Sequence, residues 1–167
     1  MGATIVRRVR SDEADALRDV RLRALLDSPA AFESTIERER AFGPEVWVER
    51  TERGAGAPDS ATFVADLDGE LIGMAGAHLE RDRPGTAYLF GMWVDPSVRR
   101  AGVGLELTRA VETWARSAGA DRIRLWVIGS NDMAIAMYLR AGYAETGESK
   151  PLRGEPANLE IEMARSL

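Results

Sequence analysis

A short glycine-containing turn is the part of the sequence best suited to chemistry. Gly102 and Gly104 follow Arg99 and Arg100 where an apolar segment ending at Val94 gives way to a helical pattern. The first N–H groups of a helix have no intrahelical partner and carry partial positive charge, so they attract phosphate. Glycine has no Cβ, which lets phosphate oxygens approach the backbone. The turn therefore predicts a phosphate site; the alternative is a connection that only turns the chain.

The motifs and residue types that the sequence lacks exclude several classes of function. Neither Gly-x-x-x-x-Gly-Lys-Ser/Thr nor Gly-x-Gly-x-x-Gly occurs, which excludes two common nucleotide motifs. The chain has no cysteine and one histidine, His78, so we expect no disulfide, no cysteine nucleophile and no metal site. A net charge of −5 argues against nucleic acid as a partner and favours cationic substrates.

The surrounding elements alternate in type. Strand patterns occupy residues 4–9, 61–67, 71–79, 86–94, 122–128, 143–147 and 159–165, with a hairpin turn at Asp68-Gly69. Helical patterns begin after Ser11, read as an N-cap, and recur over 32–52 (interrupted at Gly43-Pro44), 103–118 and 131–141. Residues 54–60 have loop composition. The order β-α-α-β-β-β-α-β-α-β-β predicts an α+β class and a single domain over residues 1–167.

Hydropathy gives no indication of a membrane. No apolar run approaches 18 residues, and the first residues lack the apolar segment of a secretory signal. We therefore expect no membrane partner and a cytoplasmic location.

Two motifs resemble those of one enzyme family. Arg99-x-x-Gly102-x-Gly104 resembles the Gln/Arg-x-x-Gly-x-Gly/Ala signature of the GNAT superfamily of N-acetyltransferases. The stretch from Asn131 through Tyr138 to Tyr143 resembles the other common motif of that family. One helix and one strand separate the two motifs, and the similar element order covers nearly the whole chain. The resemblance implies a single-domain GNAT-like fold, with a mixed, mostly antiparallel central sheet flanked by helices.

The resemblance also implies an activity and its residues. The enzyme would move an acetyl group from acetyl-CoA, its co-substrate, to a primary amine of a small molecule or peptide by direct attack on the thioester. Tyr138 would act as general acid toward the departing thiolate. The cofactor would be held by Met92 and Val94 along the pantetheine, by Asn131 on the opposite side, and at the pyrophosphate by the backbone of Arg99, Arg100, Ala101, Gly102, Val103 and Gly104. Homodimers are common in the family, so a homodimer is compatible with the resemblance.

The general base stays open. In histone-modifying members a glutamate precedes the glycine turn, and counting back from Arg99 places Phe90 at that position. The other candidates are the pair Glu33 and Glu37, expected on one helix face, the pair Glu160 and Glu162 on one strand face, and His78. Each pair is more simply a set of solvated carboxylates, or a site for a cationic acceptor.

Two other functions compete with the enzyme. A catalytically silent acyl-CoA-binding module, acting as a sensor or in recruitment, is favoured by Phe90 and opposed by Tyr138. A purely structural interaction domain is the third possibility, and it predicts no CoA binding.

Overall fold

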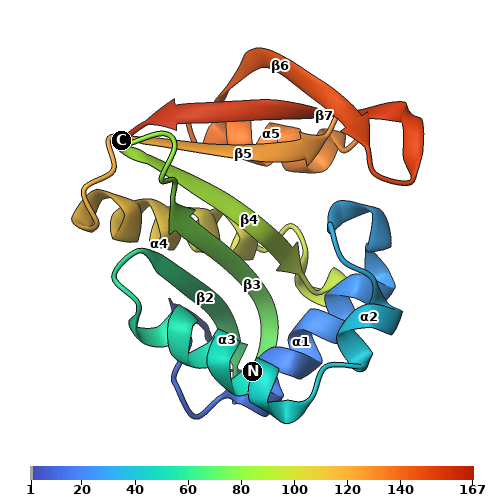
Figure 1. Ribbon diagram of the computed structural model, residues 1–167, viewed down its shortest axis with the longest axis vertical. Coiled ribbons are helices and arrows are strands. Elements are labelled where there is room, and N and C mark those ends of the chain that lie inside the picture. The colour runs from blue at the N-terminus through green and yellow to red at the C-terminus, as the bar shows by residue number, and fades with distance from the viewer. Residues whose placement is uncertain (1) are drawn as a thin grey trace.

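The computed structural model describes residues 2–167, and Figure 1 shows their arrangement. The elements follow the predicted order except that the second helical region divides into two helices, and two short 3-10 turns are added at Pro29–Ala31 and Pro96–Val98. They are β1 (Thr4–Arg8), α1 (Ala14–Asp27), α2 (Ile36–Arg40), α3 (Pro44–Gly56), β2 (Ser60–Leu67), β3 (Glu70–Leu79), β4 (Thr86–Val94), α4 (Val103–Ser117), β5 (Arg122–Ile128), α5 (Asp132–Arg140), β6 (Ala144–Leu152) and β7 (Glu155–Ser166).

Seven strands form one sheet in the order β1-β2-β3-β4-β5-β7-β6. Five of the neighbouring pairs are antiparallel, and only β4 and β5 run parallel. The predicted turn between β2 and β3 is present, with positive φ at Asp68 and Gly69, as a tight hairpin turn requires. The α+β class and the mostly antiparallel mixed sheet are confirmed.

The sheet divides where β4 meets β5. These strands pair only from Thr86 to Tyr88 on β4 and from Arg122 to Arg124 on β5. Beyond these residues they diverge, so the remainder of β4 has no strand partner on that side (Figure 1). A sheet that opens in this way leaves backbone N–H and C=O groups of β4 available to an extended ligand.

Helices cover both faces of the sheet. The side chains of α4 pack on one face in an apolar cluster that includes Leu107, Val111 and Ile123. Those of α1 pack on the other face in a second cluster that includes Val20 and Trp93. Among residues 2–167, no helix is both long enough and apolar enough to cross a bilayer.

Several predicted boundaries are wrong. Ser11 does not cap α1, because the helix begins at Ala14 and the carboxylate of Glu13 accepts the Arg10 N–H at 2.8 Å, which closes the preceding turn. The region 32–52 forms α2 and α3, and α3 runs to Gly56 into the predicted loop. The last two strands are longer than predicted because they pair with each other as a hairpin over mostly exposed residues, which carry no clear apolar alternation.

Candidate active site

The glycine turn links the end of β4 to the first turn of α4. Asp95 stabilises its start by accepting the N–H of Ser97 at 2.9 Å. Arg100 and Gly102 have φ values of 69° and 87°, in the left-handed region, and α4 begins at Val103 with Gly102 as its N-cap residue. Left-handed residues that alternate with other conformations before a helix can orient backbone N–H groups toward one concavity, an arrangement that suits an anion.

The side chain of Arg99 takes part in positioning the turn. Its Nε donates to the Val94 carbonyl at 2.9 Å, and its guanidinium forms an ion pair with Asp27 at the end of α1. The Trp93 indole also donates to Asp27, at 2.9 Å. Burial opposes ionisation of Asp27, but hydrogen bonds from Trp93, Ser28 and Arg99 hold its pKa below the usual value. The Arg99 side chain thus joins α1 to the turn, and only its backbone keeps the predicted phosphate role.

Gly104 is constrained by helix packing. A Cβ at this position would lie 2.7 Å from the sulfur of Met137 on α5, whereas a Cβ at Gly102 would meet nothing within 4 Å. The absence of a side chain at 104 therefore lets α5 approach the first turn of α4. This close contact brings the two predicted motifs together.

The part of β4 that does not pair with β5 contains a bulge on the side of β3. Met74 and Gly76 of β3 pair with Trp93 and Phe90, so β4 carries one extra residue between these positions. Gly91, at φ 63°, lies in this bulge. The bulge redirects backbone groups directly before Met92 and Val94, the predicted pantetheine edge.

Tyr138 lies on α5 with its side chain buried and 4% exposed. Its ring meets the Tyr143 ring edge-on, with 5.5 Å between the centroids. Burial raises the pKa of the phenol above its ordinary 10.0, so the group is protonated at neutral pH. Asn131 is the N-cap residue of α5, where its side chain accepts the Ala134 N–H at 3.2 Å. Its amide nitrogen alone stays available for the predicted cofactor contact.

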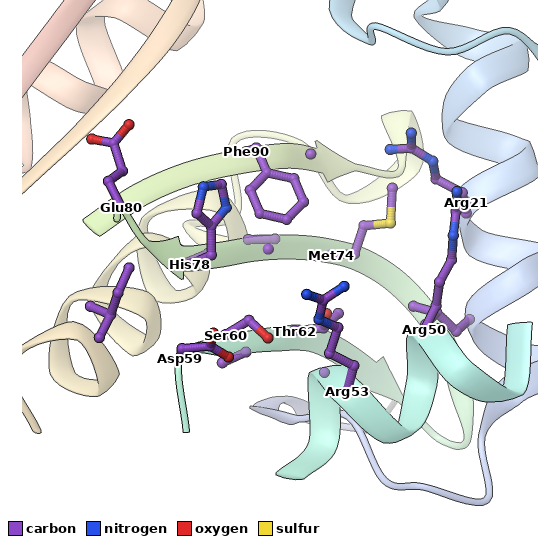
Figure 2. Close-up of a pocket in the computed structure, with 18 of the residues that line it drawn as sticks. Arg21, Arg50, Arg53, Asp59, Ser60, Thr62, Met74, His78, Glu80 and Phe90 are labelled. Carbon is purple, nitrogen blue, oxygen red and sulfur yellow. The ribbon is translucent and has the colours of Figure 1, made fainter. Parts of the chain in front are cut away.

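A cleft of about 710 Å³ opens beside the bulge. Its floor comes from β2, β3 and β4, and its wall from α1 and α3 (Figure 2). Arg21 and Arg50 lie at one end and Asp59 and Glu80 toward the other, with Arg53 between them beside Thr62.

A buried carboxylate holds two of these arginines. Glu39 of α2 is 1% exposed and accepts from Arg21 at 2.9 and 3.1 Å and from Arg50 at 3.2 Å. Burial disfavours its charge, yet Arg21 keeps the pKa of Glu39 below the usual value. The sequence gives no signal of this cluster, because Glu39 lies among charged residues of a short helix.

An aromatic group forms part of the cleft floor. The His78 ring lies 5.5 Å from both the Tyr88 and the Phe90 rings, centroid to centroid. Phe90, at the position of the family glutamate, is 43% exposed and lines the cleft with His78. Burial lowers the pKa of His78 below 6.5. The negative charges of Glu80 and Asp59 oppose this shift, and the positive charges of Arg124 and Arg53 add to it. The imidazole is therefore neutral at pH 7 and able to accept a proton.

The two predicted carboxylate pairs lie in different surroundings. Glu33 precedes α2 and pairs with Lys150 at 3.6 Å, so the expectation that Glu33 and Glu37 share a helix face is wrong. Glu160 and Glu162 do lie on one strand, but Glu162 is buried and accepts from Arg124 at 2.9 Å. Neither pair lines the cleft of about 710 Å³. Within residues 2–167 no cluster of three potential metal ligands occurs.

Comparisons with known proteins agree on one family. The mycothiol acetyltransferase of Salinispora tropica is 31% identical over 136 residues, which cover 78% of this chain and 41% of that protein. The aminoglycoside N(6')-acetyltransferase type 1 of Klebsiella aerogenes is 33% identical over 101 residues, which cover 58% of this chain and 66% of that protein. The chain thus spans less than half of the first relative and just under two thirds of the second.

A solved structure gives the same fold. The structure of yncA from Salmonella typhimurium, solved with its cofactor acetyl-CoA, has a TM-score of 0.80 at 18% identity and covers 99% of this chain and 94% of its own. The model of the acetyltransferase (GNAT) family matches residues 22–143, which include the glycine turn and Tyr138. By this match the chain belongs to the acetyltransferase (GNAT) family.

Proposed function

We propose that the protein transfers the acetyl group of acetyl-CoA to a primary amine of a small molecule or peptide. The observation that carries this proposal is the junction of three features: the diverging β4 and β5, the left-handed turn before α4, and the cleft beside Gly91. The family relatives with small-molecule acetyltransferase names, and the neighbour solved with acetyl-CoA, support the same reading.

The cofactor would lie in the opening between β4 and β5. N–H groups of the turn, from Arg99 to Gly104, would bind the pyrophosphate. The pantetheine would pair with backbone groups near Met92 and Val94, as an added strand does. This arrangement places the thioester at the β4 bulge, next to the cleft through which an amine would enter.

The reaction needs two proton transfers. The amine nitrogen attacks the thioester carbon, a C–N bond forms, the C–S bond breaks, and the electron pair leaves on sulfur. Tyr138, kept protonated by burial, would donate its proton to that thiolate. His78 would accept the proton lost by the amine through water, because its ring is neutral and faces the cleft beside Phe90.

The test combines binding with turnover. Calorimetry with acetyl-CoA measures the cofactor site, and thiol release with a library of amines measures transfer. We expect tight binding together with thiol release that depends on the amine. Binding without transfer to any amine would favour an acyl-CoA-binding sensor, and absence of binding would overturn the proposal.

A further inference from the structure

Arg21 presents an unused donor to the β4 bulge. Its Nε and Nη2 donate to Glu39 at 3.1 and 2.9 Å, and its guanidinium carbon lies 4.6 Å from the centre of the Phe32 ring. Within residues 2–167 its Nη1 makes no hydrogen bond, and it lies 3.6 Å from the place that a Cβ on Gly91 would occupy. A charged donor in a fixed orientation therefore faces the position proposed for the thioester.

The end of the cleft around Arg21 carries excess positive charge. The guanidinium groups of Arg21 and Arg50 line this end and pair with Glu39, and Arg53 lies farther along the cleft. Arg53 is exposed, points into the cleft in Figure 2, and forms no ion pair in the described part of the chain. One carboxylate against the two cations at this end leaves a net positive charge that attracts an anion, opposite to the expectation from the net charge of −5.

A second donor on the cleft lacks a partner. The Trp47 side chain is 2% exposed and lines the cleft, and its Nε1 is buried without a hydrogen bond to any residue from 2 to 167. This N–H group is covered by surrounding atoms, so it is an unpaired donor in the wall behind the cleft and not a contact for a ligand. The Nη1 of Arg21, which faces the place of a Cβ on Gly91, fits an oxygen-bearing anion.

We propose that the acceptor is an α-amino acid and that Arg21 binds its carboxylate. Only two covalent bonds separate the amine nitrogen of an amino acid from its carboxylate carbon, so an amine placed over Gly91 brings the carboxylate to Nη1 of Arg21. The Phe90 ring covers Gly76, so the side chain of the amino acid would lie against that ring. A peptide N-terminus has no carboxylate next to its amine and does not fit this arrangement. The inference rests on the proposed function.

The direct test varies only the group next to the amine. Thiol release is measured with methionine, methioninamide and 3-(methylthio)propylamine, and with phenylalanine, phenylalaninamide and phenethylamine. We expect kcat/KM for the amino acid to exceed that for its amide on the order of 10- to 100-fold, as a hydrogen bond to a charged group contributes. Equal rates, or a preference for the amides or amines, would overturn the inference and leave the proposed function intact.

Variants of Arg21 test the assignment to this residue. The double variant Arg21→Gln/Glu39→Gln removes both charges of the buried pair, so neither is left unpaired. Arg21→Lys keeps an ion pair with Glu39 but has no second nitrogen for the ligand. Both should reduce the acid-to-amide ratio to about one, while Arg109→Gln, an exposed arginine on α4, should keep it.

Two outcomes would contradict the proposal at this stage. An acid-to-amide ratio that persists in both Arg21 variants would show that another group binds the carboxylate. Binding of acetyl-CoA without thiol release for any of the six amines would overturn the inference, and the proposed function would be overturned with it only if the amine library also gave no thiol release.

Discussion

Replacement of Tyr138 by phenylalanine removes one hydroxyl group and therefore tests its role alone. The ring, its burial and its edge-on contact with Tyr143 are retained. Within residues 2–167 the Tyr138 hydroxyl makes no hydrogen bond, so its removal breaks none. We therefore expect the free energy of unfolding to change by less than about 1 kcal/mol, the typical net worth of one hydrogen bond.

The effect on chemistry should be much larger. A general acid contributes about 10²- to 10⁴-fold in rate, or roughly 3–5 kcal/mol of barrier. Tyr138→Phe should lower the single-turnover rate of acetyl transfer by at least about 10²-fold, and the affinity for acetyl-CoA should not change. Because burial raises the phenol pKa above 10.0, the wild-type rate should also show no alkaline decline from this group below pH 10.

The assay uses rapid quenching of one turnover, together with calorimetry and urea unfolding. Tyr143→Phe is the matched control, because it removes a buried hydroxyl from the ring that contacts Tyr138. A Tyr138→Phe rate within about twofold of wild type, or an equal loss in Tyr143→Phe, would refute the assignment of Tyr138 as the acid.

Three further predictions concern the turn, the proton acceptor and the buried carboxylate. Gly102→Ala should cost about 1–2 kcal/mol of stability and weaken acetyl-CoA binding in calorimetry, because a side chain disfavours φ of 87°. In wild type kcat/KM should fall as the pH drops below the His78 pKa, which lies under 6.5, and His78→Gln should remove this limb of the pH–rate profile. In the folded protein the pKa of Glu39 lies below its reference value of 4.5. Its pairing with Arg21 therefore stabilises the fold above pH 4.5, and this stabilisation is lost as the pH falls through the pKa of the folded state. Glu39→Gln should therefore lose on the order of 3 kcal/mol at pH 7 and show a flatter decline of stability in acid, measured by urea unfolding.

Local signals in the sequence predicted most of the fold. Gly119 and Gly142 end α4 and α5 with φ values of 91° and 92°, as glycine after a helix should. Asp68-Gly69 marked its hairpin because few other dipeptides adopt that turn readily. These features depend on the residues at the turn itself, so sequence reasoning reaches them.

The features that depend on distant contacts could not be predicted. The parallel pairing of β4 with β5 is set by the crossover through α4, and no residue of β4 encodes where the pairing stops. The Arg99 side chain contacts Asp27, which lies 72 positions earlier in the sequence, and no residue near Arg99 indicates this partner. The Glu39 cluster joins three helices in the same way. Side-chain partners of this kind depend on tertiary packing, whereas the backbone role of the turn depends on local conformation.

The two apolar clusters on opposite faces of the sheet have a consequence for divergence among related proteins. The cluster under α4 supports the turn and Tyr138, whereas the cluster under α1 supports the wall that carries Arg21. Effects of mutations at well-separated sites on stability are approximately additive. Substitutions under α1 that leave Asp27 and its contacts with Arg99 and Trp93 in place can therefore reshape the wall of the cleft with little effect on the packing that holds the turn. The sheet therefore lies between the packing that holds the glycine turn and most of the packing that shapes the wall of the cleft.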